Sequence, residues 1–342
     1  MAAVERLPAV VVTGGAGYIG SHVCKALAAA GYRPVTYDDL STGHSWAVRW
    51  GPMERGDVAD GRRLSAVLRL YRPVAIIHLA GRIIASESVA DPAAYYASNL
   101  LATWTLLESM RSNAVDRIVF SSSAAVYGEP ESTPMAEDHP QRPVSPYGAS
   151  KLMVERILGD FAAAYGLRSA SLRYFNAAGA DPSGELGEAH PVETHLIPLV
   201  LEAATGRLPH VSICGTDYPT RDGTCLRDYV HVSDLASAHV LALRHLAEKP
   251  GAHAFNLGGG EGATVREVVE TARRVTGRRI AVRLQPRRPG DPAALLADST
   301  RARRRLGWRP AYPSLASQIE SAWNWLESGK SRPDLVEAIG IH

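Results

Sequence analysis

The chain has 342 residues, of which 46% are hydrophobic and 21% charged, and its formal net charge is +2. This length exceeds what one hydrophobic core usually fills, so we expect two domains, or one large domain with a smaller lobe. The small net charge argues against nucleic acid as a partner, and the sequence contains no apolar run of about 18 residues that could span a membrane.

Short apolar runs alternate with amphipathic segments through the first half of the chain. Apolar runs predict buried strands, and helical periodicity with capping residues predicts helices. In chain order we expect strands at 9–13, 34–38, 74–79, 117–120 and 169–174, separated by helices at 21–30, 60–71, 92–110 and 147–165. This alternation predicts the α/β class, with a doubly wound parallel sheet of the Rossmann type.

The pattern changes after Asn176. Residues 180–190 are rich in Gly, Pro and acidic residues, as in a crossover loop, and shorter elements follow. They include a helix at 234–245, capped by Ser233 or Asp234, and a strand at 255–257. We therefore assign residues 1–176 to a Rossmann domain, with a return of the chain near 230–258, and residues 177–330 to a smaller α/β lobe.

The cysteines are Cys24, Cys214 and Cys225, and they show no CxxC or Cys/His spacing typical of zinc ligands. The sequence therefore predicts no metal site. Three scattered cysteines, with no apolar signal segment at the start of the chain, favour a reducing cytoplasm.

A glycine-rich turn joins the first strand to the first helix. Glycines at positions 14, 17 and 20 would let bare backbone approach a pyrophosphate at the N-terminus of the helix. The next strand ends in Asp38 and Asp39, where a carboxylate can bind the ribose hydroxyls of adenosine. Two carboxylates would repel a 2′-phosphate, so the sequence favours NAD over NADP.

Tyr147 and Lys151 form the only Tyr-x-x-x-Lys pair in the chain. Four residues apart on a helix they share one face, and a cation beside a phenol lowers the phenol pKa. Such a tyrosine can take a proton from an alcohol. The serines 121–123 end a strand whose edge should face the cofactor. Taken singly, each of these features is also typical of an ordinary helix or turn.

Together these motifs resemble the extended short-chain dehydrogenase/reductase family. The matching segments are Thr-Gly-Gly-Ala-Gly-Tyr-Ile-Gly at 13–20, Ser-Ser-Ser at 121–123, Val-Tyr-Gly at 126–128 and Ser-Pro-Tyr-Gly-Ala-Ser-Lys at 145–151. Within that family the chain is most similar to the UDP-glucose 4-epimerase branch, through Leu-Arg-Tyr-Phe-Asn at 172–176, His-Leu-Ile-Pro at 195–198 and Arg-Asp-Tyr-Val-His-Val at 227–232. The resemblance runs from about residue 9 to 325.

The resemblance implies a reversible oxidation at C4 of a UDP-hexose. NAD⁺ accepts the hydride, Tyr147 as phenolate takes the hydroxyl proton, and Ser123 holds the oxygen. Lys151 lowers the Tyr147 pKa and binds the nicotinamide ribose. The 4-keto sugar turns over and the hydride returns to its other face, so NAD stays tightly bound. The cofactor-binding residues implied in this way are Gly14, Gly17, Tyr18, Ile19, Gly20, Asp38, Asp39, Asp57, Val58, Leu79, Ala80, Gly81, Asn99, Ser121, Tyr147, Lys151 and Phe175.

The resemblance places the UDP-sugar mainly in the second lobe. Arginine suits the diphosphate because its planar fork donates paired hydrogen bonds, although Arg288 also reads as a surface charge in a basic stretch. Asp228 and His231 are expected to be structural. The implied substrate-binding residues are Ser123, Tyr147, Asn176, His195, Leu196, Ser212, Cys214, Arg227, Arg288, Asp291 and Leu295. The family also implies a homodimer, in which the helix at 92–110 and the helix after Tyr147 form a four-helix bundle.

Three positions depart from the family pattern. Ile83 replaces a lysine near the cofactor phosphates, although Arg82 is adjacent, and Cys214 replaces an aromatic residue beside the uracil. Leu295 replaces a tyrosine that narrows the sugar pocket. An epimerase of another UDP-sugar, whether an N-acetylhexosamine, a pentose or a uronic acid, is therefore an alternative.

Two further classes are less compatible with the residues. Dehydratases carry an acid just before Val-Tyr-Gly, where this chain has Ala124 and Ala125, which cannot donate a proton. A non-catalytic NAD-binding sensor would not need Ser123, Tyr147 and Lys151 together.

Overall fold

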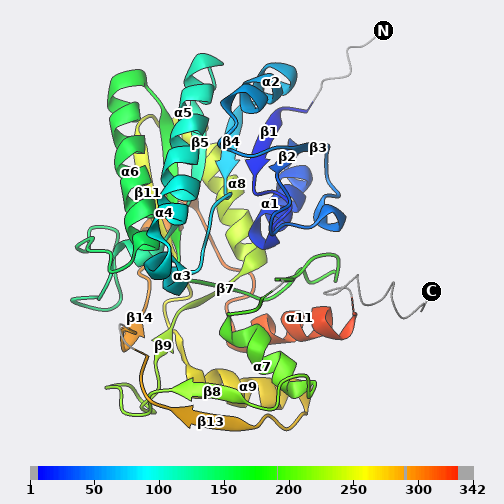
Figure 1. Cartoon of the computed structure of the whole chain (residues 1–342), viewed down its shortest axis with the longest axis vertical. Helices are drawn as coiled ribbons and strands as arrows, with labels where there is room; N and C mark the ends of the chain where they lie inside the picture. The colour runs from blue at the N-terminus through cyan, green and yellow to red at the C-terminus, as the bar shows by residue number, and fades with distance from the viewer. Residues whose placement is uncertain (1–6, 191, 289–290, 330–342) are drawn as a thin grey trace.

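The computed structural model describes residues 7–190, 192–288 and 291–329. A seven-stranded sheet lies at the centre of its larger part, in the order β11-β6-β5-β4-β1-β2-β3, and all neighbouring strands are parallel (Figure 1). Its strands are β1 (Ala9–Thr13), β2 (Arg33–Asp38), β3 (Met53–Arg55), β4 (Ala75–His78), β5 (Arg117–Ser123), β6 (Arg168–Tyr174) and β11 (Ala252–Leu257). The predicted Rossmann sheet is confirmed.

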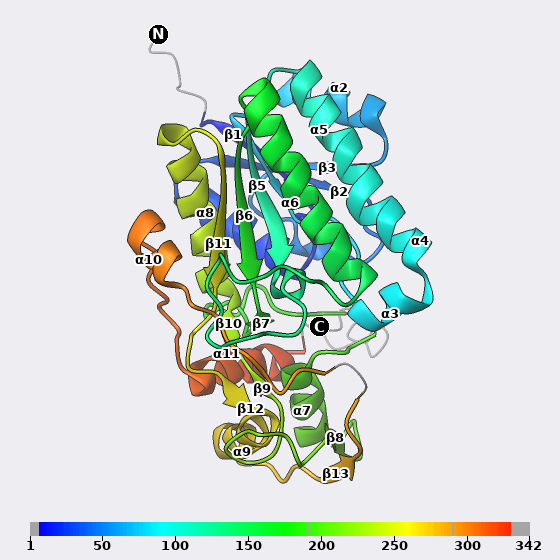
Figure 2. The same cartoon turned by 90° about the vertical axis from the view of Figure 1, so that its left-hand side faces the viewer.

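Helices cover both faces of this sheet, which is why every residue of the central strands β1 and β4 is buried. Val10 and Val12 of β1 pack on one face with α1 (Tyr18–Ala29) and α8 (Val232–Glu248). Val11 packs on the other face with α2 (Gly61–Tyr71), α5 (Ala102–Ser112) and α6 (Pro146–Tyr165). Figure 2 shows α5 and α6 side by side over that second face. No helix among the described residues has the length and apolar character needed to cross a bilayer.

The segment predicted as one helix at 92–110 is helical but not uniform. It starts as α4 (Pro92–Tyr95), capped by the Asp91 carboxylate, widens into a π-helical stretch (Tyr96–Leu101) and continues as α5. π-Helical turns are rare and concentrate at functional sites. This one contains Asn99, a predicted cofactor-binding residue. The short helix α3 (Ala85–Ala90) precedes it.

The smaller part lies below the large sheet in Figure 1 and has its own apolar core. The strands β8 and β13 pair in parallel, and so do β9 and β14. The helix α9 contacts both α7 and α11. The elements of this part are α7 (Leu196–Ala204), β8 (Val211–Cys214), β9 (Leu226–Arg227), β12 (Ala263–Thr264), α9 (Val265–Thr276), β13 (Val282–Gln285), β14 (Ala294–Leu295) and α11 (Leu315–Glu327).

Three segments of the second half of the chain pack with the first. The edge strand β11 pairs with β6, and α8 and α10 (Thr300–Leu306) pack in the same core as β1. The strands β7 (Asn176–Ala178) and β10 (Tyr229–His231) pair where the two parts meet. Residues 1–6 and 330, at the limits of the predicted domains, lie outside the described residues.

The predicted cap of the helix at 234 was wrong. The helix α8 begins at Val232, and its N-terminal cap is His231, whose Nδ1 accepts the Ser233 N–H at 3.1 Å. The Asp234 carboxylate instead accepts the backbone N–H groups of Ala311 and Tyr312, at 2.7 and 3.0 Å. The Asp234 carboxylate oxygens thus bind the backbone of residues 311–312 and do not cap the helix.

Candidate active site

The glycine turn lies where the strand order reverses, between β1 and β4. Gly14 has a φ of +73°, and a Cβ on it would come within 2.7 Å of the Ala80 nitrogen. A Cβ on Gly20 would come within 2.0 Å of the Gly14 carbonyl oxygen. Only glycine fits at either position. The bare backbone at the start of α1 is thereby open to a dinucleotide pyrophosphate, at the position where doubly wound sheets bind such ligands.

The carboxylate of Asp38 is fixed at the end of β2. It accepts the Ala16 amide at 3.0 Å and the Leu40 amide at 2.8 Å. Burial raises the pKa of Asp38, and these two amides oppose the shift. The carboxylate is therefore oriented beside the glycine turn. Asp39 follows on the surface and accepts the backbone and side-chain donors of Ser41.

The other predicted cofactor residues gather at the same edge of the sheet. Each lies at or just after the carboxyl end of a strand, or in the π-helical stretch. Asn99 accepts the Arg82 amide at 2.8 Å and donates to the Arg82 carbonyl at 3.0 Å. The loop after β4 is thus held against that helix. The residues placed in this way are Asp57, Val58, Leu79, Ala80, Gly81, Asn99, Ser121 and Phe175.

The structure brings Tyr147, Ser123 and Lys151 together at the same edge. Ser145 caps α6 by accepting the Gly148 amide at 3.2 Å, which sets Tyr147 and Lys151 on consecutive turns. The Tyr147 hydroxyl hydrogen-bonds with Ser123. Lys151 Nζ donates to the Ser121 carbonyl at 2.9 Å and lies 5.9 Å from the Tyr147 ring centre.

The protonation of this trio follows from its burial. Burial raises the pKa of Tyr147, and the hydrogen bond with Ser123 opposes that shift. Burial also lowers the pKa of the Lys151 ammonium to about 8. Lys151 was expected to lower the pKa of Tyr147, but in this structure only burial and the Ser123 hydrogen bond change it. In this state the Tyr147 phenol is protonated near neutral pH.

A close packing contact positions Ser123. The turn after β5, Ala124–Val126, lies against the first turn of α6. A Cβ on Gly148 would come within 2.4 Å of the Ala125 carbonyl oxygen. Small residues at 124, 125 and 148 therefore bring the serine strand and the tyrosine helix into contact.

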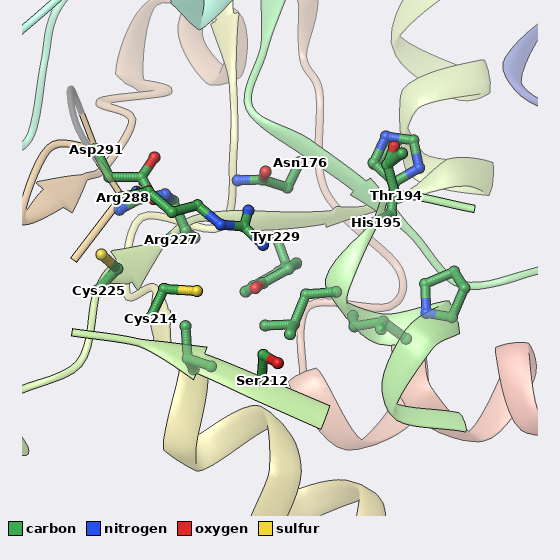
Figure 3. Close-up of a pocket in the computed structure, with 15 residues that line it drawn as sticks. Asn176, Thr194, His195, Ser212, Cys214, Cys225, Arg227, Tyr229, Arg288 and Asp291 are labelled. Atoms are coloured by element: carbon green, nitrogen blue, oxygen red, sulfur yellow. Dashed lines mark ion pairs between the residues drawn. The ribbon is translucent and has the colours of Figure 1, made fainter. Parts of the chain in front are cut away.

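A pocket in the smaller part collects most of the predicted substrate residues (Figure 3). Thr194 and His195 lie at one end of it, and Cys225 and Asp291 at the other. The predicted residues that line it are Asn176, His195, Leu196, Ser212, Cys214, Arg227, Arg288 and Asp291. The lining residues that the sequence did not identify are Ala177, Thr194, Ile197, Pro198, Cys225, Tyr229 and Val265, each close in the chain to a predicted residue except Val265.

The arginines of this pocket differ in how they are held. Arg227 donates to the Pro292 carbonyl at 2.9 Å, and its guanidinium lies 3.6 Å from an Asp291 carboxylate oxygen. Arg288 is exposed at the rim. Two guanidinium groups with an amide and hydroxyls suit a phosphate-bearing ligand.

Leu295 lies outside this pocket. It packs with Phe175 against the apolar cluster that contains Ala124 and Tyr127. Its side chain thereby lies close to the turn Ala124–Val126, which follows Ser123.

The departure at position 83 is not compensated in this structure. Ile83 is 48% exposed. The Arg82 guanidinium pairs with Glu87 at 3.1 Å, and both side chains are largely exposed. Position 83 therefore carries no charge, and the charge of the neighbouring Arg82 is paired with the Glu87 carboxylate.

A buried polar network lies beside β5, the strand that ends at Ser123. It was not predicted from the sequence. Arg173 of β6 forms an ion pair with Glu155 of α6 at 2.5 Å, with side chains 4% and 9% exposed. The Ser122 hydroxyl donates to the same carboxylate at 2.5 Å. Arg173 also donates to the Tyr127 hydroxyl at 2.9 Å and the Glu137 carbonyl at 3.0 Å. The network links β5, β6 and α6, and Ser122 is its member on β5.

Comparisons with known proteins agree with this architecture. A profile of the NAD dependent epimerase/dehydratase family matches residues 10–258. A UDP-glucose 4-epimerase of Rhizobium meliloti (strain 1021) is 51% identical over 316 residues, covering 92% of this chain and 96% of the relative. The crystal structure of UDP-glucose 4-epimerase from Brucella ovis in complex with NAD superposes with a TM-score of 0.91 at 51% identity, covering 92% of this chain and 97% of that one. The Bifidobacterium longum enzyme in complex with NAD⁺ and UDP gives 0.89 at 38% identity, covering 94% and 99%. The chain therefore belongs to the NAD dependent epimerase/dehydratase family, among its UDP-glucose 4-epimerases.

Proposed function

We propose that this chain interconverts UDP-glucose and UDP-galactose with tightly bound NAD. The observation that carries the proposal is the placement of Tyr147, Ser123 and Lys151 at the sheet edge that also holds the glycine turn. Ala124 and Ala125 occupy the turn beside them. No proton donor therefore stands where a dehydratase needs one.

The residues present fit NAD. The absence of a Cβ at Gly14 and Gly20 leaves a cradle of bare backbone, and Asp38 is oriented beside it for the adenosine ribose. Lys151 would donate to the nicotinamide ribose. Bound NAD⁺ would supply a hydride acceptor for C4 and a positive charge beside the phenol.

The chain's own residues would handle the proton and the orientation of the sugar. Tyr147 would take the 4-hydroxyl proton and later return it. Ser123 would hold the same oxygen through both steps. Lys151 is held by the Ser121 carbonyl, and its ammonium would lie near the phenolate once the phenolate forms.

The pocket in the smaller part would bind the uridine diphosphate. Arg227 and Arg288 would bind the phosphates, since arginine forks match phosphate oxygens. Asn176 lines the pocket where β7 and β10 pair. The nucleotide would then lie in one part of the molecule and the sugar at the edge of the other.

The direct test supplies purified protein with UDP-galactose and no added NAD. We expect UDP-glucose to form up to equilibrium, because the cofactor is regenerated in every cycle. Net NADH formation would favour an oxidoreductase, loss of water a dehydratase, and the absence of turnover with NAD bound a non-catalytic sensor. Each of these outcomes contradicts the proposal.

A second substrate class follows from Leu295. This side chain packs with Phe175 beside the catalytic turn, and it is shorter than tyrosine and has no phenol. We expect the sugar site beside Tyr147 and Ser123 to admit UDP-N-acetylglucosamine as well. No turnover of that substrate at high enzyme concentration would rule this out, and pentose and uronic-acid nucleotides are assayed in parallel.

Substitution of Leu295 gives the matching prediction. Leu295→Tyr should lower kcat/KM for the N-acetyl sugar by about tenfold to 100-fold, since steric exclusion of a small group costs about 1–3 kcal/mol. Turnover of UDP-galactose should change little. Leu284→Tyr, at a position 60% exposed, is the control. Equal losses for both substrates in Leu295→Tyr would refute a selective role.

We also propose a homodimer formed through α5 and α6. Leu101 at the end of the π-helical stretch, Trp104 of α5 and Met153 of α6 are 62%, 47% and 39% exposed, although large apolar side chains are usually buried. The same face of a second copy would cover them as a four-helix bundle. Sedimentation equilibrium should give the dimer mass, and Trp104→Glu should shift it to monomer. A wild-type monomer at micromolar concentration would contradict the dimer.

A cytoplasmic location is part of the proposal. All three cysteines are free, as in proteins of reducing compartments.

A further inference from the structure

A cluster of two histidines and two glutamates lies on the loop before α7. Glu188, His190, Glu193 and His195 each offer one ligand atom, and these four atoms lie within 4.8 Å of one another. Residue 191 lies outside the described residues. No metal site was predicted from the sequence, because the cysteines show no CxxC or Cys/His spacing and this cluster contains no cysteine.

The histidine–carboxylate separations are close to those between ligands of a tetrahedral site. With zinc–ligand bonds of about 2.0–2.1 Å, neighbouring ligand atoms lie about 3.3 Å apart. His190 Nδ1 lies 3.2 Å from Glu188 Oε1 and 3.4 Å from Glu193 Oε2. His195 Nδ1 lies 2.7 Å from Glu188 Oε1 and 3.2 Å from Glu193 Oε1. Glu193 thus faces the two histidines with different oxygens, of which one would bind the metal.

Hydrogen bonding alone serves this arrangement poorly. Each Nδ1 carries at most one hydrogen, yet each faces two carboxylates. Burial opposes protonation of the imidazoles, but hydrogen bonds with Glu188 and Glu193 outweigh it and raise the pKa of His190 to about 9 and of His195 to about 10. A divalent cation would displace these two protons and bind all four side chains with the same total charge.

The surroundings hold the carboxylates in place. The Glu193 carboxylate accepts the backbone amides of Thr194 and His195, both at 2.7 Å. The Glu188 carbonyl accepts the Trp325 indole N–H at 3.0 Å. Such outer contacts orient metal ligands and raise affinity.

We propose that Glu188, His190, Glu193 and His195 bind one Zn²⁺ ion. The ion would fix a loop that joins the two halves of the site. His195 lines the lobe pocket, and at the other end of the loop Gly179 accepts the Tyr18 hydroxyl of the glycine turn. Lys25 of α1 pairs with Asp181 of the same loop at 2.8 Å. Zinc would therefore stabilise the contact between the cofactor turn and the lobe.

The test measures metal in the full-length protein without an affinity tag. After dialysis against Zn²⁺ and then metal-free buffer, we expect about one equivalent by mass spectrometry and a raised thermal midpoint that a chelator reverses. Co²⁺ in its place should give the intense visible absorption of tetrahedral coordination. His190→Gln and Glu193→Gln should each weaken zinc binding by more than about 100-fold, because each removes a ligand. His253→Gln, at a half-buried histidine of β11 whose ring contacts the Pro250 carbonyl, is the control.

Three results would overturn the proposal. They are failure of the wild type to retain zinc, an octahedral Co²⁺ spectrum, and unchanged affinity in both ligand variants. Circular dichroism establishes that the variants fold, and two separate substitutions guard against one misfolding. Because the readout is metal content and not turnover, the result is independent of the epimerase proposal.

Discussion

Tyr147→Phe should lower kcat for UDP-galactose by at least about 10²–10⁴-fold, the range typical for loss of a general acid–base group. The ring and its packing against Tyr95 remain, at a centroid distance of 6.4 Å, so the fold should be intact. Only the hydroxyl that transfers the proton and contacts Ser123 is removed. Initial rates of the purified variant, with its thermal midpoint measured in parallel, provide the test.

A matched control separates this role from a general effect of losing a phenol on α6. Tyr165, on the last turn of that helix, is 61% exposed. Tyr165→Phe should retain wild-type activity. Near-normal turnover by Tyr147→Phe would refute the assignment of Tyr147 as the group that moves the proton.

Arg173→Met should destabilise the protein by about 3–5 kcal/mol, because it leaves the Glu155 carboxylate buried without its partner. The Tyr127 hydroxyl and the Glu137 carbonyl lose a donor at the same time. Urea unfolding followed by circular dichroism measures the free energy of unfolding. The variant that also carries Glu155→Leu should recover part of the loss, since the unpaired charge is then gone.

An exposed arginine provides the comparison for this second prediction. Arg142 pairs with Glu131 at 2.6 Å, but the two side chains are 77% and 56% exposed. Arg142→Met should therefore cost less than about 1 kcal/mol. A similarly small cost for Arg173→Met would show that the buried network does not hold the catalytic strand in place.

The sequence predicted the fold well where burial is continuous. The run at 9–13 is β1 residue for residue, because a strand covered on both faces has no polar position. The helix predicted at 60–71 is α2, which Asp60 caps by accepting the amides of Arg62 and Arg63. The prediction failed at α8, where Asp234 bonds a distant segment. A capping residue with a tertiary partner cannot be recognised from local pattern.

The site divides in the same way. The glycine turn, Tyr147 and Lys151 were predictable because each depends on spacing within one element. The Arg173–Glu155 pair was not, because its members are brought together only when β6 packs on α6. The state of Tyr147 was not predictable either, because burial of the phenol outweighs the effect expected of Lys151. The cluster of Glu188, His190, Glu193 and His195 was not predictable, because only the folded loop brings these four side chains together.

The central claim is that the hydride removed from C4 returns to the same carbon. The most direct measurement follows UDP-galactose deuterated at C4, without added NAD, by nuclear magnetic resonance. The account predicts UDP-glucose with deuterium retained at C4, no incorporation from solvent and no accumulation of reduced cofactor. Loss of the deuterium to solvent, or its net recovery in NADH, would contradict it.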